Sequence, residues 1–354
     1  MEVFGGMSEA RLLEIIAGFS KARIAVLGDF FLDKYLDVDP VLAETSLETG
    51  KTAHQVVAVR HSPGAAGTVV NNLAALGACT LFAVGFTGDD GEGYELRQDL
   101  GRLGCNTEHL FSAPDRHTPT YCKPRDASGA GLASEHPRYD IKNRTPTSVP
   151  LQERLVAALD AVLPLVDAVI VADQVDEHDC GVVTDRIIDV LADRPKRLPR
   201  MLLWADSRRR IGKFRRVVVK PNQFEAVGWA DPPPGAKVET ERLLPALAEF
   251  RRKTGAPVVV TLGAEGILVS DPGPTRIPAV RVEGPIDSTG AGDSTTAGMV
   301  LALVAGASYP EAALVGNLVA SITIEQLSTT GTARPEELPP RLEKWRRGSH
   351  EADR

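Results

Sequence analysis

The sequence of 354 residues predicts an α/β fold, in which a mostly parallel central sheet carries helices on both faces. Short apolar runs recur along the chain, and each ends in glycine or a polar residue, as strands buried on both faces do. Segments with helical spacing of apolar residues separate several of these runs, which is typical of a sheet between two helical layers. Ligands of such sheets bind at the carboxyl ends of the strands, so we expect functional side chains there.

The N-terminal third already shows this alternation. The expected elements are a helix over 9–19, a strand in RIAVLGDFFLDKYL (23–36), an exposed strand in HQVVAVRH (54–61), a glycine-rich turn and helix in SPGAAGTVVNNLAALGA (62–78), a strand and loop in TLFAVGFTGDD (80–90), and a helix over 93–104. The last helix is expected to stop at its terminal glycine, Gly104.

The alternation continues toward the C-terminus. Apolar runs span 167–173, 200–207, 216–222 and 256–263, with helical segments at 151–165, 180–192 and 240–254. The polar residues that follow the strands are Asp29, Asp33, Asp173, Asp206, Asn222 and Thr261. Outside these elements we expect a loop or partial lid at 126–150, a surface loop at 231–237 and a frayed tail at 345–354.

Composition excludes some classes of function. Hydrophobic residues make up 43% and charged residues 25%, which is ordinary for a soluble globular protein. The formal net charge of −7 argues against a nucleic-acid partner, although a local basic cluster could still bind a small anion. The four cysteines form no CxxC pair, and no apolar run is long enough to cross a membrane. We therefore expect a cytoplasmic protein with reduced thiols.

The stretch Thr289-Gly290-Ala291-Gly292-Asp293 places a carboxylate inside a glycine turn before a helix. Successive N–H groups at a helix start bind anions such as phosphate. A carboxylate beside a phosphate makes sense as a general base, which takes a proton from a hydroxyl while the amides stabilise the transferred phosphoryl group. The alternative is that Asp293 simply caps a buried helix.

Two further strand ends are candidates for a nucleotide and a metal. In KPNQFEAV, Asn222 and Glu225 can face the same way on a first helical turn and suit a magnesium ion held through water. The alternative is a capping box, in which the same two residues cap the helix. In TLGAEG, Thr261, Gly263 and Gly266 are open to a nucleotide, or else form a hairpin turn. No Walker A motif and no GxGxxG fingerprint after the first strand is present.

The motifs GD-x-x-LD (Gly28–Asp33), KPNQFEAV, TLGAEG and DSTGAGDS, in this order and spacing, resemble the ribokinase-like (PfkB) sugar kinase family over about residues 22–340. Within the family, VLGDFFLDKYL, HSPGAAGTVVNNLAALGA and GTARPEEL resemble most the heptose 7-phosphate kinase branch, without the adenylyltransferase domain that some members carry. The resemblance implies a single kinase domain over residues 1–354, with a ribokinase-like three-layer sandwich and a small β lid.

The resemblance also implies a role for each motif residue in an ATP- and Mg²⁺-dependent phosphoryl transfer to a sugar or sugar phosphate. Asp293 would be the base, and Gly290, Ala291 and Gly292 would supply the anion-hole amides. Nucleotide contacts would come from Asn222, Glu225, Thr261, Gly263, Gly266 and Asn317, with Glu225 also organising magnesium through water. A monovalent cation is a further candidate ligand, and for Asn317 the alternative is a core residue bonded to backbone.

The sugar contacts implied by the resemblance are Asp33, Gly64, Thr68, Asn72, Lys123, Arg125, Asp173 and Arg208. Lys123 and Arg125, with Arg138 as a third candidate, could clamp a phosphate already on the sugar; the alternative is a solvated hairpin. For Arg209 and Arg210 we expect a solvated basic face. This chain has Ala65 where relatives have a second glycine, and Thr68 where they have asparagine, so the sugar contact must differ.

The lid implied by the resemblance spans about residues 35–61, with a contribution from about 117–140, and would close over the sugar and form a homodimer contact. Two other hypotheses remain open at this point. One is a kinase of another small substrate, such as a nucleoside, on the same architecture. The other is a non-catalytic sugar or nucleotide sensor, which the intact Asp293 motif disfavours.

Overall fold

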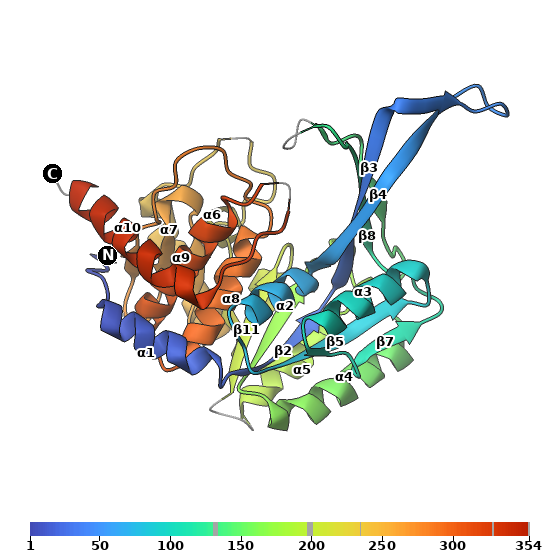
Figure 1. Ribbon diagram of the computed structural model, residues 1–354. Helices are drawn as coiled ribbons and strands as arrows, with labels where there is room; N and C mark the ends of the chain where they lie inside the picture. Colours follow the sequence, from blue (N-terminus) through green and yellow to red (C-terminus); the bar gives the residue numbers. More distant parts are fainter. Residues whose placement is uncertain (130–133, 197–200, 234, 328, 353–354) are drawn as a thin grey trace.

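A computed structural model of the chain describes residues 1–129, 134–196, 201–233, 235–327 and 329–352. The larger part of the chain is an α/β body, and a long β hairpin rises from it as an arm (Figure 1). The two chain ends lie near each other on the side of the body away from the arm.

The central sheet is parallel throughout, as the sequence predicts. Its strand order is β12-β11-β10-β2-β5-β6, and β7 pairs with the far end of β5. The strands are β2 (Arg23–Gly28), β5 (Thr80–Gly88), β6 (Cys105–Asn106), β7 (Leu110–Ala113), β10 (Ala168–Asp173), β11 (Leu202–Ser207) and β12 (Val218–Val219). The carboxyl ends of β2, β10, β11 and β12 consequently meet at one edge.

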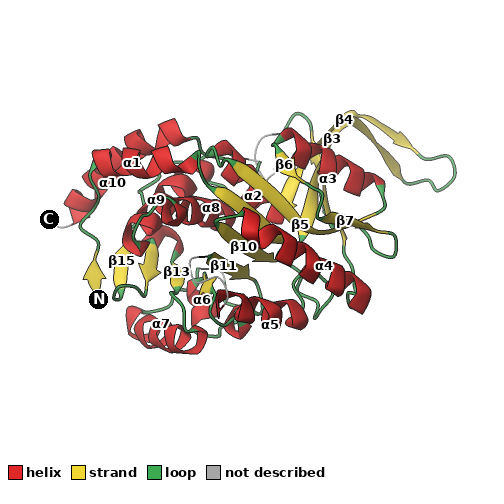
Figure 2. Cartoon of the chain, turned by 90° about the horizontal axis from the view of Figure 1, so that it is seen from below, coloured by secondary structure: helices red, strands yellow, loops and turns green. Residues whose placement is uncertain are grey.

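Helices cover both faces of this sheet, which confirms the three-layer prediction (Figure 2). One face carries α1 (Glu9–Phe19), α2 (Ala66–Ala75), α3 (Gly91–Arg102), α8 (Ala291–Val304), α9 (Tyr309–Thr323) and α10 (Leu338–Ala352). The other carries α4 (Val149–Val162), α5 (Asp185–Asp193) and α7 (Thr240–Thr254). Strand β2 shows why two cores form: Ile24 and Val26 pack into one, while Ala25 and Leu27 pack into the other.

A second sheet continues the body beyond β12. It contains β13 (Val259–Thr261), β14 (Ile267–Val269), β15 (Thr275–Ile277) and β1 (Glu2–Val3). Strand β13 keeps the parallel direction, because Val219 bridges Val258 and Asn222 bridges Thr261 in parallel register. The turn after β13 leads into antiparallel β14, so TLGAEG forms the hairpin turn that was the alternative to an open nucleotide loop. A hairpin and a nucleotide contact are compatible, since the turn follows the strand end.

The arm is a four-stranded sheet of order β4-β3-β8-β9. Its strands are β3 (Phe30–Thr45), β4 (Thr52–Ala65), β8 (Thr120–Asp126) and β9 (Tyr139–Ile141). The hairpin is longer than the predicted 35–61, because β3 starts directly after Asp29 in the body. On one face of the arm's root, Lys34 pairs with Glu92 and Glu95 of α3 at 3.3 and 2.9 Å. The arm is thus fixed to the body at its root, while its distal half extends away from it.

The tail is ordered up to residue 352, which corrects the expectation of fraying from residue 345. Residues 338–352 form α10, and Trp345 is only 3% exposed. Its indole N–H donates to the carbonyl of Pro278 at 2.7 Å, and the Arg346 guanidinium donates to the carbonyl of Met7 at 2.6 Å. Leu338, Leu342 and Trp345 form a short buried stripe in the first half of this helix, and the polar residues that follow Trp345 gave no sign that the helix continues.

Trp345→Ala should lower the free energy of unfolding by about 3–5 kcal/mol, because it removes a buried ring and leaves a cavity. Trp345→Phe keeps the ring but loses the bond to Pro278, so it should cost about 1 kcal/mol. Urea unfolding followed by circular dichroism measures both. An alanine variant as stable as the parent would show that the tail does not contribute to the core.

Candidate active site

The glycine turn before α8 lies against α2. Gly290 caps α8 in the left-handed region, with φ at 76°, where other residues are strained. A Cβ atom at Gly290 would lie 3.2 Å from the Thr68 methyl carbon. The backbone N–H of Ala291 already donates to the carbonyl of Ser288 at 3.1 Å. Of the predicted anion-hole amides, the N–H of Gly292 is therefore the better candidate, together with that of Asp293 in the same first helical turn.

Beneath this turn lies a buried cation that the motif assignment did not include. Lys220 follows β12, is 4% exposed, and its ammonium group pairs with Asp206 at the end of β11 at 2.7 Å. A Cβ atom at Gly292 would lie 3.4 Å from the Lys220 nitrogen. The ammonium group thus lies next to Gly292, in the turn that is predicted to bind an anion. Its signal in the sequence is the lysine of KPN, two residues before Asn222.

The carboxyl group of Asp293 is half-buried in the first turn of α8. Removal from water raises its pKa to about 7, and the negative charge of Asp206 adds to this shift. Lys220 and Arg208 oppose the shift but do not cancel it. A carboxyl group with a pKa near 7 can both take up and release a proton at neutral pH, as a general base must.

The capping-box alternative for Asn222 and Glu225 is what the structure shows at the start of α6 (Gln223–Ala226). The Asn222 side-chain oxygen accepts from the N–H groups of Phe224 and Glu225, both at 2.9 Å. One Glu225 oxygen accepts from the N–H of Asn222 at 2.8 Å. Burial raises the pKa of Glu225 to about 7, with Asp206 contributing. The cap uses one oxygen of each side chain, so the other Glu225 oxygen is left for a metal or water.

The remaining predicted nucleotide residues lie along β13 and around the end of β15. Gly263 adopts a positive φ of 60° with open space at its Cβ position, whereas a Cβ at Gly266 would collide with the backbone of Ile277. Glycine is thus required at position 266, because any side chain there would clash with the neighbouring strand. The Asn317 amide donates to the carbonyls of Ile277 and Pro278 at 3.2 and 3.0 Å. Asn317 therefore matches its alternative, a core residue bonded to backbone.

Four of the predicted sugar residues, Asp33, Gly64, Lys123 and Arg125, lie on the strands of the arm. Asp33 pairs with Lys123 at 3.0 Å, and both are buried. A Cβ at Gly64 would lie 2.9 Å from an Asp33 carboxylate oxygen, so a larger residue at position 64 would displace this carboxylate. Asn72 is fully buried; its amide nitrogen donates to the Thr68 carbonyl at 3.0 Å, while its amide oxygen has no hydrogen-bond partner among the described residues. The negative charge of Asp33 contributes to the raised pKa of Asp293.

Asp173 does not present its carboxylate to a sugar, contrary to the expectation. It is 1% exposed, accepts from the Ser207 hydroxyl at 2.6 Å and from Arg210 Nε at 3.1 Å, and also pairs with a terminal nitrogen of Arg210. Arg210 is 7% exposed, so the predicted solvated basic face is wrong for it and correct only for Arg209. Arg208 is exposed, and its charge lowers the pKa of Asp293. Buried pairing of Asp173 with Arg210 joins the ends of β10 and β11 and so positions Asp206 and Arg208.

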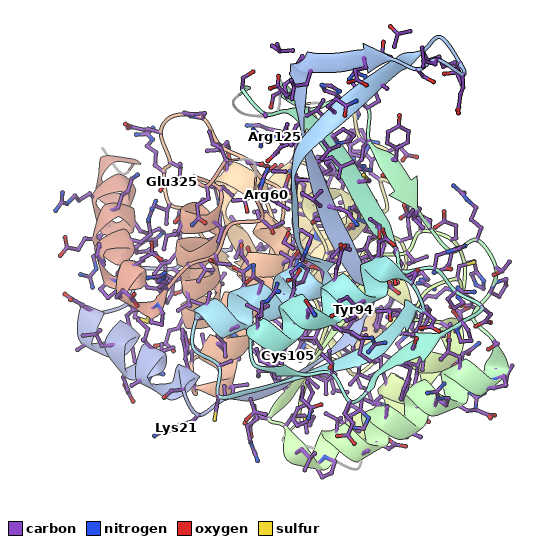
Figure 3. The ribbon with its side chains drawn as sticks, turned by 45° about the vertical axis from the view of Figure 1, so that its right-hand side comes forward. Lys21, Arg60, Tyr94, Cys105, Arg125 and Glu325 are labelled. Carbon is purple, nitrogen blue, oxygen red and sulfur yellow. The ribbon has the colours of Figure 1, made fainter. Side chains whose placement is uncertain are left out.

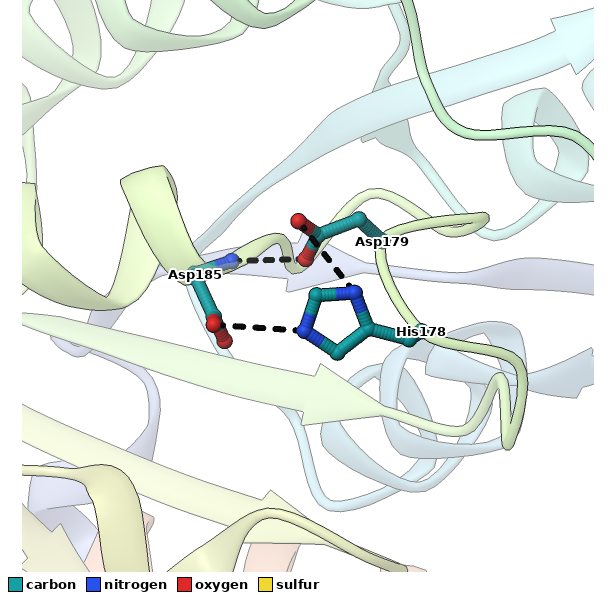
Figure 4. A group of neighbouring side chains, drawn as sticks. All are labelled: His178, Asp179 and Asp185. Carbon is teal, nitrogen blue, oxygen red and sulfur yellow. Dashed lines mark hydrogen bonds and ion pairs between the residues drawn. The ribbon is translucent and has the colours of Figure 1, made fainter.

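A second group of possible metal ligands lies apart from this site, in the segment before α5. His178, Asp179 and Asp185 point toward one another, and their ligand atoms lie within 4.8 Å (Figure 4). Lys213 already pairs with both Asp185 oxygens, at 2.6 and 2.8 Å, and Asp179 caps the N–H of Asp185 at 2.9 Å. These contacts account for the cluster as an ion-pair network that holds the start of α5.

The fold agrees with solved kinase structures. Escherichia coli phosphofructokinase-2 in complex with potassium superimposes with a TM-score of 0.68 at 16% identity, covering 92% of this chain and 99% of that one. Arabidopsis thaliana ribokinase complexed with ribose and ATP gives a TM-score of 0.61 at 17% identity, covering 92% and 98%. Among the described residues, no helix combines the length and apolarity needed to span a bilayer.

Comparison of the sequences identifies the family, which the likeness of the fold alone does not. The bifunctional protein HldE of Desulfatibacillum aliphaticivorans is 30% identical over 326 residues, which are 90% of this chain and 63% of the relative. The chain thus spans less than two thirds of the length of this relative. The family model of the pfkB carbohydrate kinases matches residues 22–336, close to the range that the motifs indicate. Together with the fold and the arrangement around Asp293, this match shows that the chain belongs to the pfkB family of carbohydrate kinases.

Proposed function

We propose that this protein transfers the γ-phosphoryl group of ATP to a hydroxyl of a sugar or sugar phosphate, with a heptose 7-phosphate-like acceptor as the best candidate. The observation that carries the proposal is the arrangement around Asp293. A carboxyl group with a pKa near 7 stands in the first turn of α8, beside backbone amides and above a buried ammonium group. Together they supply a proton acceptor and positive charge at one place, which phosphoryl transfer requires.

In the proposed reaction, the sugar lies between the arm and the start of α8. Asp293 takes the proton of the attacking hydroxyl, while the N–H groups of the turn and the Lys220 ammonium stabilise the charge on the transferred group. ATP lies along β13 and the hairpin turn at Gly263. A heptose 7-phosphate-like acceptor would direct its phosphate up the arm, toward Lys123 and Arg125. The arm acts as the lid that excludes water.

Oxygen ligands for magnesium are present next to Lys220. Glu225 keeps one carboxylate oxygen outside its capping contact, and carboxylates and waters are the ligands that Mg²⁺ prefers. Glu225 would hold the ion through water, and the bound ion neutralises charge on the phosphate oxygens of ATP. Adding KCl to the same assay tests the role of a monovalent cation.

The distal arm supports the proposal of a homodimer. Large apolar side chains are exposed along the hairpin, some beyond the end of β8 and some beside it: Val41, Leu42, Leu47, Val56, Val57 and Val59. An isolated two-stranded ribbon is marginally stable in water, so a second copy of the arm would cover these side chains. Four free cysteines fit the proposed cytoplasmic location.

Asp293→Asn should lower kcat by about 100-fold or more, because the amide cannot accept the proton, while ATP affinity stays near that of the parent. For the parent enzyme, kcat/KM should fall as the pH drops below about 7, where Asp293 becomes protonated. Coupled ADP release and calorimetric ATP titration measure these quantities. An asparagine variant with full turnover would exclude Asp293 as the base.

The same substitution should stabilise the free protein at high pH. A raised pKa means that the folded state binds the proton more tightly than the unfolded chain, so its contribution to stability is lost as the pH rises through about 7. Asp293→Asn should therefore raise the free energy of unfolding at pH 8 by more than about 1 kcal/mol, and much less at pH 5. Asp206→Asn is the contrasting variant: it leaves the buried Lys220 unpaired and should destabilise at pH 8. If both variants changed the free energy of unfolding at pH 8 by the same amount, this electrostatic account would be contradicted.

Arg125→Ala should lower kcat/KM for a sugar phosphate by about 10- to 100-fold, since it removes a charged hydrogen bond, and should leave the unphosphorylated sugar nearly unaffected. Lys123→Ala should impair both sugars, because it leaves the buried Asp33 without its partner. Initial rates with D-glycero-D-manno-heptose 7-phosphate and the free heptose separate the two effects. Arg194→Ala, which breaks a comparable pair with Asp160 far from the site, is the control. Equal losses for both sugars in Arg125→Ala would refute the phosphate clamp.

A further inference from the structure

One face of the arm carries a ladder of charged side chains that reaches beyond the predicted sugar residues. Strand register places Tyr35 between Arg60 of β4 and Lys123 of β8. Asp33, two residues before Tyr35 on β3, lies next to the predicted sugar site. Asp37, two residues after Tyr35, lies opposite Arg125 of β8. Side chains two residues apart share a face of a strand, and each such step advances about 6.6 Å. The ladder therefore leads away from Asp293 in two steps.

The middle step is built around the Tyr35 ring. The Arg60 guanidinium carbon lies 5.1 Å from the ring centre and the Lys123 nitrogen 4.9 Å. The Lys123 nitrogen also lies 3.4 Å from the Tyr35 hydroxyl. The Tyr35 ring thus contacts one cation from each neighbouring strand, and each contact is a favourable cation–π interaction.

Asp37 fixes the orientation of Arg60. Its carboxylate accepts from Nε and one terminal nitrogen of Arg60 at 3.0 and 3.1 Å, the forked geometry that holds a guanidinium in one plane. Arg125 lies 3.7 Å from the same carboxylate. The other terminal nitrogen of Arg60 has no partner among the described residues, so it can donate to a ligand. The Arg60 side chain is 47% exposed, and a ligand can reach it.

The ladder gathers charged groups of both signs. Arg60, Lys123 and Arg125 are three cations, and Asp33 and Asp37 are the two acids that pair with them. Glu135, which bridges Arg125 in the strand register, is a third acid close to Tyr35. Figure 3 shows Arg60 and Arg125 on the same side of the hairpin, the side that faces the C-terminal half of the body. Both guanidinium groups thus lie on the side of the arm that faces the body.

We propose that Arg60 determines specificity for an acceptor that already carries a dianionic group such as phosphate, by binding that group together with Arg125. Asp37 and Tyr35 hold Arg60 ready for it. The inference rests on the proposed sugar-kinase function and adds to it a residue outside the motifs that define the family resemblance. Surface ion pairs alone contribute little to stability, so a purely structural role for Arg60 and Asp37 predicts no difference between acceptors.

The test is calorimetric binding of two probes, D-glycero-D-manno-heptose 7-phosphate and the free heptose, without nucleotide. Arg60→Ala should weaken binding of the sugar phosphate about 10-fold or more and leave the free heptose within about twofold. Arg60→Lys should recover part of the loss, because it restores the charge without the fork. Arg23→Ala is the matched control: Arg23 forms the same forked pair with Asp167 at the opposite end of the sheet.

Binding of the sugar phosphate that is equal in Arg60→Ala and the parent would overturn the inference, even if the parent is an active kinase. Equal weakening for both probes would also overturn it, because the effect would then be structural. Conversely, a parent that binds the sugar phosphate in an Arg60-dependent way but transfers no phosphoryl group from ATP would support this subsite and refute the proposed function. Melting temperatures of all variants confirm that the arm is folded.

Discussion

The buried ion pair between Lys220 and Asp206 is the interaction on which the candidate site depends. Burial alone would lower the pKa of the lysine, but the adjacent carboxylate more than reverses this and keeps the ammonium charged. That charge lies against the backbone of Gly292, below Asp293. Without it, three carboxyl groups, those of Asp206, Glu225 and Asp293, would repel one another with no ammonium group between them. The lysine lets the fold hold them together.

The same arrangement leaves the free site under electrostatic stress. The pKa values of Asp293 and Glu225 are each raised to about 7, which means that ionising them in the folded protein is costly. Groups of this kind concentrate in functional sites, where a ligand or metal supplies the missing positive charge. The capping box of Ser308 and Glu311 differs from that of Asn222 and Glu225, because there the Arg11 guanidinium, together with the contacts to Ser308, lowers the pKa of the glutamate.

The sequence was informative wherever a local pattern determined the structure. Apolar runs ending in polar residues predicted the parallel sheet, and motif order predicted that Asp293, Asn222 and Asp33 would meet at one edge. The sequence was not informative where contacts between residues far apart in the chain determine the structure. Asp173 and Arg210 are far apart in the chain, and nothing local shows that they neutralise each other. Likewise Tyr35, Asp37 and Arg60 form one face only because β3, β4 and β8 pair in a particular register.

The two faces of the arm have separate functions. Under the proposed function, one face can therefore change the range of acceptors while the other keeps the arm attached. Lys34 and His61, neighbours across the hairpin, point to α3 and attach the arm, while the adjacent residues Asp33 and Arg60 belong to the opposite face. If a substitution moves a cation by two residues along β3, β4 or β8, the cation stays on the same face as Arg60. Its position shifts by two residues of strand, about 6.6 Å. Under the proposed function, the position of the arginines along the hairpin therefore sets the length of acceptor that fits, and neither the attachment of the arm nor the catalytic turn has to change.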